Sequence, residues 1–196
     1  GIVDKKNSLP ILSNILIEAK ENKLTLSSTD MDISIIEKID CNVLEEGATT
    51  INSQILYDIV RKLDENCEIE IISNNGKLLT LRASGSRFSL ACLPKEDYPI
   101  IDQDSSGTSI SINSKILFKL IDKTKFAISN EETRYFLNGL YFNINREDKL
   151  NVVTLVGTDG HRLAKFSYNL ETDIDEISGV IIPKKTIYEL SKLLSE

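Results

Sequence analysis

The feature that most constrains how this chain folds is an internal repeat. Residues 49–65, TTINSQILYDIVRKLDE, resemble residues 180–196, VIIPKKTIYELSKLLSE. Upstream of each, residues 12–30 resemble residues 137–159, and both of these segments end in a Thr-Asp pair. Self-similarity of this kind indicates two copies of one structural unit. Two domains are therefore expected, covering residues 1–106 and 107–196, with an extended linker in 94–107, where two prolines and a polar run occur.

Each copy contains a part that the other lacks. The first copy ends with residues 67–94, whose pattern predicts the strands that close a sheet, and the second stops before such strands. The second begins with residues 109–129, a predicted strand and helix, whereas only a few residues precede Leu9 in the first. We therefore expect a first domain without its N-terminal strand and helix, and a second domain without its C-terminal strands.

Most of the chain is predicted to form short strands. Apolar and polar residues alternate in 23–39, 67–72, 77–83 and 87–93. Helical spacing occurs in 54–63, around Leu117, Leu120 and Ile121, and in 186–194. The pattern predicts an α+β protein in which short strands outnumber the helices.

Composition excludes some classes of protein. A formal net charge of −7 argues against a chain that coats itself with nucleic acid, although a local basic patch remains compatible with DNA contact. No run approaches the ~18 apolar residues of a membrane span. The three cysteines, Cys41, Cys67 and Cys92, are odd in number and far apart, which favours buried thiols in a reducing cytoplasm over a disulfide or metal framework.

The only histidine lies in the segment 157–165, GTDGHRLAK. One hypothesis is an enzyme in which Asp159 and His161 form an acid/base pair. Gly160 favours instead a turn between the strands 150–156 and 162–168. A metal site is poorly supported with one histidine and no cysteine nearby, and no cofactor motif is present.

The repeat gives this turn added interest. Its counterpart in the first copy reads STDMDISI, so the two copies share Thr-Asp and differ in the next four residues. A shared turn that carries Gly-His-Arg-Leu in one copy alone indicates a function specific to that copy. Glycine permits close backbone approach, Arg162 offers several donors, and Leu163 offers an apolar wall. Two interpretations remain beside catalysis: a docking surface for a partner, and an ordinary turn whose histidine bonds to the backbone.

Lysines gather on the predicted helices. Lys115, Lys119 and Lys123 follow each other at intervals of four residues, which places them on one helical face. The last helix begins with Lys184 and Lys185 and also carries Lys192. Solvated helix faces explain such lysines, yet in an acidic protein they also indicate a segregated positive face suited to phosphate contact.

Several motifs together resemble the bacterial sliding clamp family, the β subunit of DNA polymerase III. They are SLPILSNILIEA, KLTLSSTDMDISI, GATTINSQILYDIVRKL, SRFSLACLPKEDYP, RYFLNGLYF, TDGHRLA and IIPKKTIYEL. The resemblance runs from Leu9 to Leu194 and implies a DNA-clamp fold of repeated domains. Antiparallel sheets would lie outside and two helices per domain on the inner face, with a third domain absent from this chain. It also implies a non-catalytic processivity factor, a homodimeric ring at full length, that encircles duplex DNA without sequence specificity.

The resemblance assigns a role to the Gly-His turn. It implies a pocket in which short motifs of the replicative polymerase α subunit, the clamp loader and other clamp-binding proteins dock. The matching positions are Arg134, Tyr135, Phe136, Leu137, Thr158, Gly160, His161, Arg162 and Leu163. The remainder of that pocket is expected from sequence beyond Glu196.

The resemblance also implies contacts with DNA. The DNA-facing positions are Lys6, Gln54, Arg61, Lys119, Lys123, Tyr135, Phe136, Lys184 and Lys185. Glu131 falls in a loop where the family often has a neutral polar residue, and a carboxylate there would repel phosphate. The expected hold on DNA is topological, because many weak, salt-screened contacts permit sliding.

Overall fold

The computed structural model describes residues 9–74, 76–99, 110–131, 133–147, 150–170 and 176–195. The chain divides into two compact units, residues 1–103 and 104–196. None of the helices in the described ranges is long and apolar enough to cross a bilayer.

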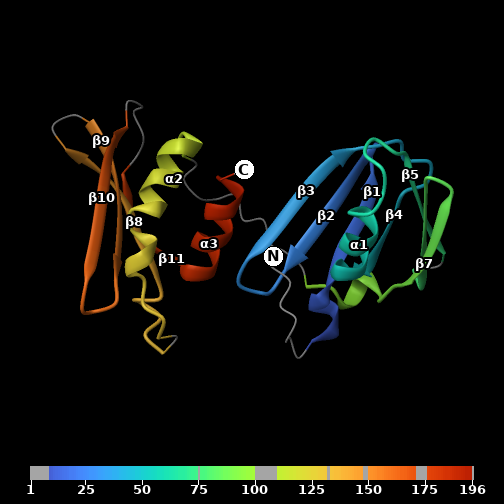
Figure 1. Ribbon diagram of the computed structural model, residues 1–196, viewed down its shortest axis with the longest axis horizontal. Helices are drawn as coiled ribbons and strands as arrows, with labels where there is room; N and C mark the ends of the chain where they lie inside the picture. Colours follow the sequence, from blue (N-terminus) through green and yellow to red (C-terminus); the bar gives the residue numbers. More distant parts are fainter. Residues whose placement is uncertain are drawn as a thin grey trace. The chain divides into compact units, whose positions relative to one another are not determined.

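The first unit contains two antiparallel sheets and one α-helix among its described residues (Figure 1). Its larger sheet has the strand order β3-β2-β1-β4 and its smaller sheet the order β5-β6-β7. The strands are β1 Asn14–Lys20, β2 Lys23–Thr29, β3 Ser34–Asp40, β4 Gly47–Asn52, β5 Ile69–Asn74, β6 Leu78–Ala83 and β7 Ser86–Ala91. The helices are the 3-10 turns η1 Pro10–Ser13 and η2 Lys95–Asp97, and α1 Ser53–Val60.

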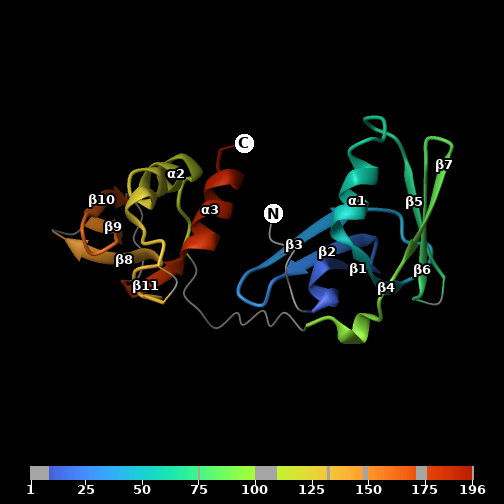
Figure 2. The same cartoon turned by 60° about the horizontal axis from the view of Figure 1, so that its bottom comes forward.

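In the second unit, two α-helices lie on one face of a four-stranded sheet (Figures 1 and 2). The strand order is β10-β9-β8-β11. The strands are β8 Gly139–Glu147, β9 Leu150–Thr158, β10 Leu163–Leu170 and β11 Ile177–Pro183. The helices are α2 Ser114–Asp122, the 3-10 turn η3 Lys125–Ala127, and α3 Lys184–Leu193.

The strand order and register confirm the repeat found in the sequence. β8, β9, β10 and β11 take the places of β1, β2, β3 and β4, and every pairing is antiparallel in both units. The pair Ile15↔Ile51 in the first unit corresponds to Leu140↔Ile182 in the second. A helix follows β4 and β11 directly, so α1 and α3 are also equivalent.

The helices begin at the expected places for local reasons. The side chain of Asn52 accepts a hydrogen bond from the Ile55 N–H, and that of Asn113 accepts one from the Lys115 N–H, which caps α1 and α2. α3 is preceded by Pro183, which removes a backbone donor outside the helix. α1 ends at Val60 and not at Leu63 as predicted, because the next residues tighten into i→i+3 bonds.

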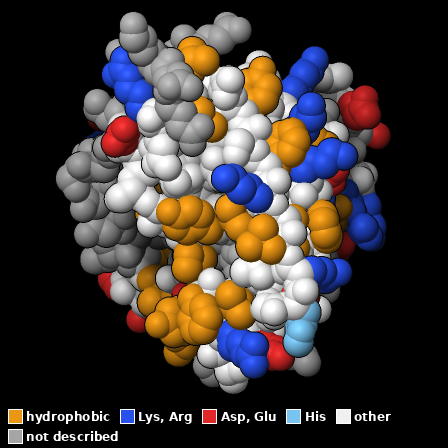
Figure 3. All heavy atoms as spheres, turned by 90° about the vertical axis from the view of Figure 1, so that its left-hand side faces the viewer, with side chains coloured by type: hydrophobic (Ala, Val, Ile, Leu, Met, Phe, Trp, Pro, Cys, Tyr) orange, Lys and Arg blue, Asp and Glu red, His pale blue; other side chains and the backbone are white. Residues whose placement is uncertain are grey.

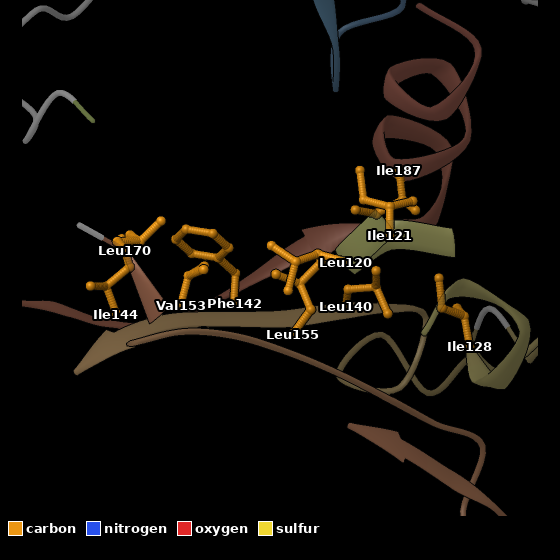
Figure 4. Close-up of a cluster of buried hydrophobic side chains, with 10 residues drawn as sticks. All are labelled: Leu120, Ile121, Ile128, Leu140, Phe142, Ile144, Val153, Leu155, Leu170 and Ile187. Atoms are coloured by element: carbon orange, nitrogen blue, oxygen red, sulfur yellow. The ribbon is translucent and has the colours of Figure 1, made fainter. Parts of the chain in front are cut away.

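The core of the second unit lies between the helices and the sheet. Ile187 of α3 and Leu120 and Ile121 of α2 are fully buried and point toward side chains of β8 and β9 (Figure 4). The cluster comprises Leu120, Ile121, Ile128, Leu140, Phe142, Ile144, Val153, Leu155, Leu170 and Ile187. This packing fixes the register of β9, and therefore the position of the turn after it.

Two predictions from the sequence need correction. The segment predicted to start the linker folds onto the first unit instead: η2 occupies its first residues, and Tyr98 is only 5% exposed. The rest of that linker, residues 100–107, lies outside the described residues. The strand predicted before α2 is not formed by residues 110–113, because Ile110 and Ile112 pack singly against the core and have no paired strand in the described part of the chain.

Candidate functional site

The segment GTDGHRLAK forms the tight turn that joins β9 to β10, as the sequence predicted. The Thr158 hydroxyl donates to the Arg162 carbonyl oxygen at 2.7 Å and accepts from the Gly160 N–H at 3.1 Å. One carboxylate oxygen of Asp159, Oδ1, accepts from the N–H groups of His161 and Arg162 at 3.0 and 2.9 Å. Thr158 and Asp159 therefore hold the turn by side-chain to backbone bonds.

The first copy builds the same turn with the same bonds. There the Thr29 hydroxyl donates to the Ile33 carbonyl oxygen at 3.0 Å and accepts from the Met31 N–H at 3.1 Å. The Asp30 carboxylate accepts from the N–H groups of Asp32 and Ile33 at 3.0 and 2.7 Å. The shared Thr-Asp pair is thus explained by folding alone, and the copies differ in the side chains that the turn presents.

The left-handed position of each turn is also shared. Gly160 has φ +89°, and its counterpart Met31 has φ +80°. Glycine adopts this conformation without the steric cost that a side chain brings. The second copy therefore forms its turn with less strain than the first, and it presents His161 at the tip, exposed to solvent.

The bonds of Asp159 argue against the acid/base pair. The backbone N–H of Arg162, followed by that of His161, lowers the pKa of Asp159 below its ordinary 3.8, and the Arg162 guanidinium adds to this effect. In the described residues, none of the hydrogen bonds joins this carboxylate to the imidazole of His161. A carboxylate held ionised by three donors is a poor proton carrier near neutral pH.

Two arginines flank the turn, and each has an acidic partner. Arg162 Nε lies 2.9 Å from Asp159 Oδ2, and Arg134 Nε lies 2.9 Å from Glu131 Oε2. Glu131, expected to repel DNA, is therefore neutralised locally by Arg134. Arg134 also reaches the turn, since its Nη1 lies 3.9 Å from the place where a Cβ on Gly160 would stand.

An apolar surface surrounds these charges. Leu163, Tyr135 and Phe136 are 66%, 78% and 54% exposed, and the last two rings meet edge to face at 5.5 Å between centroids. Leu137 is half-buried, and its N–H donates to the Arg134 carbonyl oxygen in the loop before β8. Figure 3 shows hydrophobic side chains gathered on this face of the second unit, with the single histidine beside them. Contiguous exposed apolar surface is typical of a docking site.

The structure adds a residue that the sequence did not single out. Phe126, in η3, is 58% exposed, and the Arg162 guanidinium lies over its ring at 5.9 Å from the centroid. A cation over an aromatic ring is attracted by the ring's negative face. Sequence spacing carried no signal for Phe126, because it reaches the turn only through the packing of η3 against β9 and β10.

The predicted DNA-facing lysines of the second unit lie in its helix layer. Lys115 and Lys119 on α2 and Lys123 at its C-cap are exposed, and none of the three belongs to an ion pair of the described residues. Lys119 also lies over the Phe166 ring at 5.6 Å. Lys184 and Lys185 start α3 and line a hollow of about 320 Å³ together with Asn130, Asn138, Tyr188 and Glu189.

The remaining predicted DNA contacts are spread more widely. Gln54 and Arg61 both lie on or beside α1 in the first unit, and both contact Asp58, at 3.1 and 3.3 Å. Tyr135 and Phe136 belong to the loop beside the β9–β10 turn and not to the helix layer of the second unit. Lys6 lies outside the described residues.

Metal-ligating side chains do not cluster in the described part of the chain. Within that part, His, Cys, Asp and Glu form no group of three or more that could hold an ion. Cys41, Cys67 and Cys92 are free thiols of intermediate burial. The described residues therefore supply no candidate metal centre beside the turn.

Comparison with known proteins places both units in one family. The family model described as DNA polymerase III beta subunit, N-terminal domain, matches residues 1–102, and the one described as the central domain of that subunit matches residues 111–196. The beta sliding clamp of Caulobacter vibrioides strain NA1000 is 40% identical over 195 residues, covering 99% of this chain and 52% of its own length. That of Rickettsia bellii is 35% identical, covering 100% and 50%.

Solved structures agree. The sliding clamp of Bartonella birtlesii, crystallised with griselimycin, has a TM-score of 0.91 and 41% identity, covering 99% of this chain and 52% of that one. Caulobacter crescentus pol III beta gives a TM-score of 0.92 and 40% identity, covering 100% and 53%. The chain thus spans about half the length of the relatives it matches. These matches confirm the clamp fold predicted from the motifs, and the chain belongs to the DNA polymerase III beta subunit family, the bacterial sliding clamps.

Proposed function

We propose that this chain is the DNA-polymerase processivity clamp of its cell, or the part of it spanning the first two domains. The observation that carries the proposal is the match of both units, in order, to the N-terminal and central domains of the beta subunit. The whole protein would form a homodimeric ring around duplex DNA and would tether the replicative polymerase, the clamp loader and other partners.

The turn between β9 and β10 is the proposed docking site for these partners. The fixed backbone of Thr158 and Asp159 presents His161 and Leu163 outward, and the loop 134–137 adds exposed aromatic rings. An apolar surface that is rigid before binding loses little conformational entropy when a short peptide docks. Arg134 and Arg162 would orient acidic or amide groups of that peptide.

The helix layer is the proposed DNA-facing side. Lys119 on α2 and Lys185 at the start of α3 are exposed and Lys184 is half-buried, and these lysines act as point charges without reading bases. We propose a clamp without catalytic activity, because the one candidate acid/base pair is occupied by structural hydrogen bonds. A peptide-binding module without a DNA role is the second hypothesis, and a DNA-loading experiment beside a peptide-binding experiment distinguishes the two.

The primary experiment loads the whole protein onto nicked circular plasmid with its clamp loader and then linearises the plasmid. Retention on circles at high salt, abolished by linearisation, is expected of a topological ring. Salt-sensitive binding that ignores DNA ends would refute the ring. Replacing Lys119, Lys184 and Lys185 by Gln should make DNA binding in the absence of the clamp loader less dependent on salt. The slope of the logarithm of the binding constant against the logarithm of the salt concentration should become shallower by about 0.9 for each phosphate that is no longer neutralised. The matched control is Lys165→Gln, which lies on the sheet and not on a helix.

The docking proposal is tested with a fluorescent peptide carrying the polymerase's clamp-binding motif. His161→Ala in the whole protein should weaken binding by about tenfold, the effect of a contact worth more than 1 kcal/mol. Met31→Ala, at the tip of the equivalent turn in the first copy, is the matched control and should leave the affinity unchanged. Equal affinities of the parent and His161→Ala would overturn the assignment.

A further inference from the structure

The side chain of Arg162 is not needed to form the turn between β9 and β10. Its counterpart in the first copy is Ile33, whose N–H donates to the Asp30 carboxylate at 2.7 Å. The second copy uses the Arg162 N–H in the same way, at 2.9 Å from Asp159 Oδ1. Because the backbone builds this turn with either residue, the guanidinium of Arg162 has no part in the hydrogen bonds that the two turns share.

Two contacts nevertheless fix this guanidinium. Its Nε donates to Asp159 Oδ2 at 2.9 Å, and the group lies over the Phe126 ring at 5.9 Å from the centroid. The first contact holds one edge of the planar group and the second holds one face. Within the described part of the chain, the side-chain hydrogen bond and ion pair of Arg162 both involve Nε. The two Nη groups therefore remain as donors on a side chain that is more than half exposed.

Phe126 projects from a rigid part of the second unit. It is the middle residue of η3, and Thr124, Ala127 and Ile128 around it are buried. The Thr124 hydroxyl donates to the Leu120 carbonyl oxygen at 2.8 Å, and Ile128 belongs to the buried cluster between the helices and the sheet (Figure 4). The backbone on both sides of the ring is thus anchored to the core, and the ring has a fixed place beside the turn.

The ring itself contributes little to that core. Phe126 is 58% exposed, and the stabilisation from burying an apolar side chain scales with the area removed from water. Its contact with Arg162 has a clearer consequence. A long side chain that is already ordered in the free protein loses less conformational entropy when a ligand binds. A planar guanidinium with two available Nη groups suits an oxygen acceptor.

We propose that Phe126 is a positioning residue of the docking site. Together with Asp159 it holds the Arg162 guanidinium, so that the Nη groups donate to an oxygen acceptor of the docked peptide, either a carboxylate or a backbone carbonyl. Phe126 acts through Arg162 and does not itself contact the peptide. The inference rests on the proposed docking function of the turn, and it extends the site to η3.

The test is a double-mutant cycle in the whole protein, measured with the fluorescent peptide that carries the polymerase's clamp-binding motif. Phe126→Leu, which keeps an apolar side chain but removes the ring, should weaken binding roughly three- to tenfold, the effect of one side chain that must be ordered on binding. In the Arg162→Gln background the same substitution should change the affinity by less than about twofold, because the group that Phe126 positions is gone. Phe126→Tyr keeps the ring and should restore the parent affinity.

A matched control comes from the first unit. There the Arg61 guanidinium lies over the Tyr57 ring at 5.6 Å, and Tyr57→Leu should leave peptide affinity unchanged. Circular dichroism of each variant confirms folding, and Phe126→Met replaces Phe126→Leu if the latter does not fold.

The outcomes separate this inference from the docking proposal. An equal loss of affinity from Phe126→Leu in the parent and in Arg162→Gln would overturn it, because Phe126 would then act by direct contact or through stability. Parent affinity in Phe126→Leu would overturn it as well, and would leave the docking site standing. A parent protein that does not bind the peptide would overturn the docking site itself.

A second peptide identifies the acceptor. In it, every Asp and Glu is replaced by Asn and Gln. If the effect of Phe126→Leu disappears with this peptide, the acceptor is a carboxylate. If the effect persists, the acceptor is a backbone carbonyl, and either result supports the positioning role.

Discussion

Gly157→Ala tests how the β9–β10 turn, the proposed docking site, is anchored to the core. A Cβ on Gly157 would stand 2.7 Å from the Thr124 carbonyl oxygen and 2.9 Å from Leu140 Cδ2. Neither neighbour moves easily, because the Thr124 carbonyl oxygen accepts a hydrogen bond from the N–H of Ala127, the last residue of η3, and Leu140 is fully buried. Extra atoms in a packed site of this kind cost about 1–3 kcal/mol.

The measurement is the melting temperature of the second unit by scanning calorimetry. A loss of about 2 kcal/mol lowers the melting temperature of a unit of this size, residues 104–196, by roughly 8–16 °C. Because η3 carries Phe126, which lies under Arg162, docking of a clamp-binding peptide should weaken together with stability.

The repeat supplies a control for this substitution. The counterpart of Gly157 is Ser28, whose hydroxyl is buried without a hydrogen-bond partner in the described structure. Ser28→Ala removes an unsatisfied polar group and should change stability by less than about 0.5 kcal/mol, or raise it slightly. An unchanged melting temperature for Gly157→Ala would refute the argument that the backbone after α2, at Thr124, packs directly on β9.

Two further predictions concern pH. Asp159→Asn should loosen Arg162 and weaken peptide binding several-fold. Because the pKa of Asp159 is lowered in the folded turn, the ionised carboxylate stabilises the turn above pH 3.8, and this stabilisation is lost as the pH falls through the folded-state pKa. Titrations of peptide binding across acid pH measure this loss. Asp30→Asn, in the equivalent turn, should leave peptide affinity unchanged. Burial raises the pKa of Tyr98 above 10.0, and the hydrogen bond from the Thr29 backbone opposes this increase only in part. The neutral Tyr98 hydroxyl therefore stabilises the folded state below pH 10, and this stabilisation is lost as the pH rises through the folded-state pKa. Tyr98→Phe should lower the free energy of unfolding by about 0.5–1.5 kcal/mol. In denaturant titrations it should also remove the loss of stability at alkaline pH. A variant that loses stability above pH 10 as steeply as the parent would show that Tyr98 is not the group responsible.

Much of the fold follows from local sequence signals. Alternation of apolar residues located the strands, and helical spacing located α1, α2 and α3 to within a few residues. The Thr-Asp pairs marked both turns, because a threonine hydroxyl and an aspartate carboxylate bond to N–H groups two and three residues ahead. Those hydrogen bonds join residues that are two or three positions apart along the chain, and a sequence pattern is sufficient to predict them.

Both the sequence motifs and the tertiary structure were needed to identify the candidate site. The motif RYFLNG with TDGHRLA downstream of it predicted its residues, and the structure brings Arg134 to Gly160 because β8 and β9 are neighbours in the sheet. Phe126 was not predicted, since its place under Arg162 depends on where η3 packs. Likewise, a separation of two residues along the chain did not make Asp159 and His161 partners, because the backbone donors of the turn are closer to the carboxylate.

The repeat, the succession of strands and the chemistry offered at the turn could all be predicted from the sequence, since these depend on neighbours along the chain. Which surfaces are covered depends instead on tertiary packing. Tyr98 belongs to a segment whose prolines and charges predicted a linker, yet its ring and hydroxyl find partners on β1 and β2, far away in sequence. Burial is a property of the residues that pack against a side chain from elsewhere in the chain, and for that reason the sequence of Tyr98 and its neighbours did not reveal it.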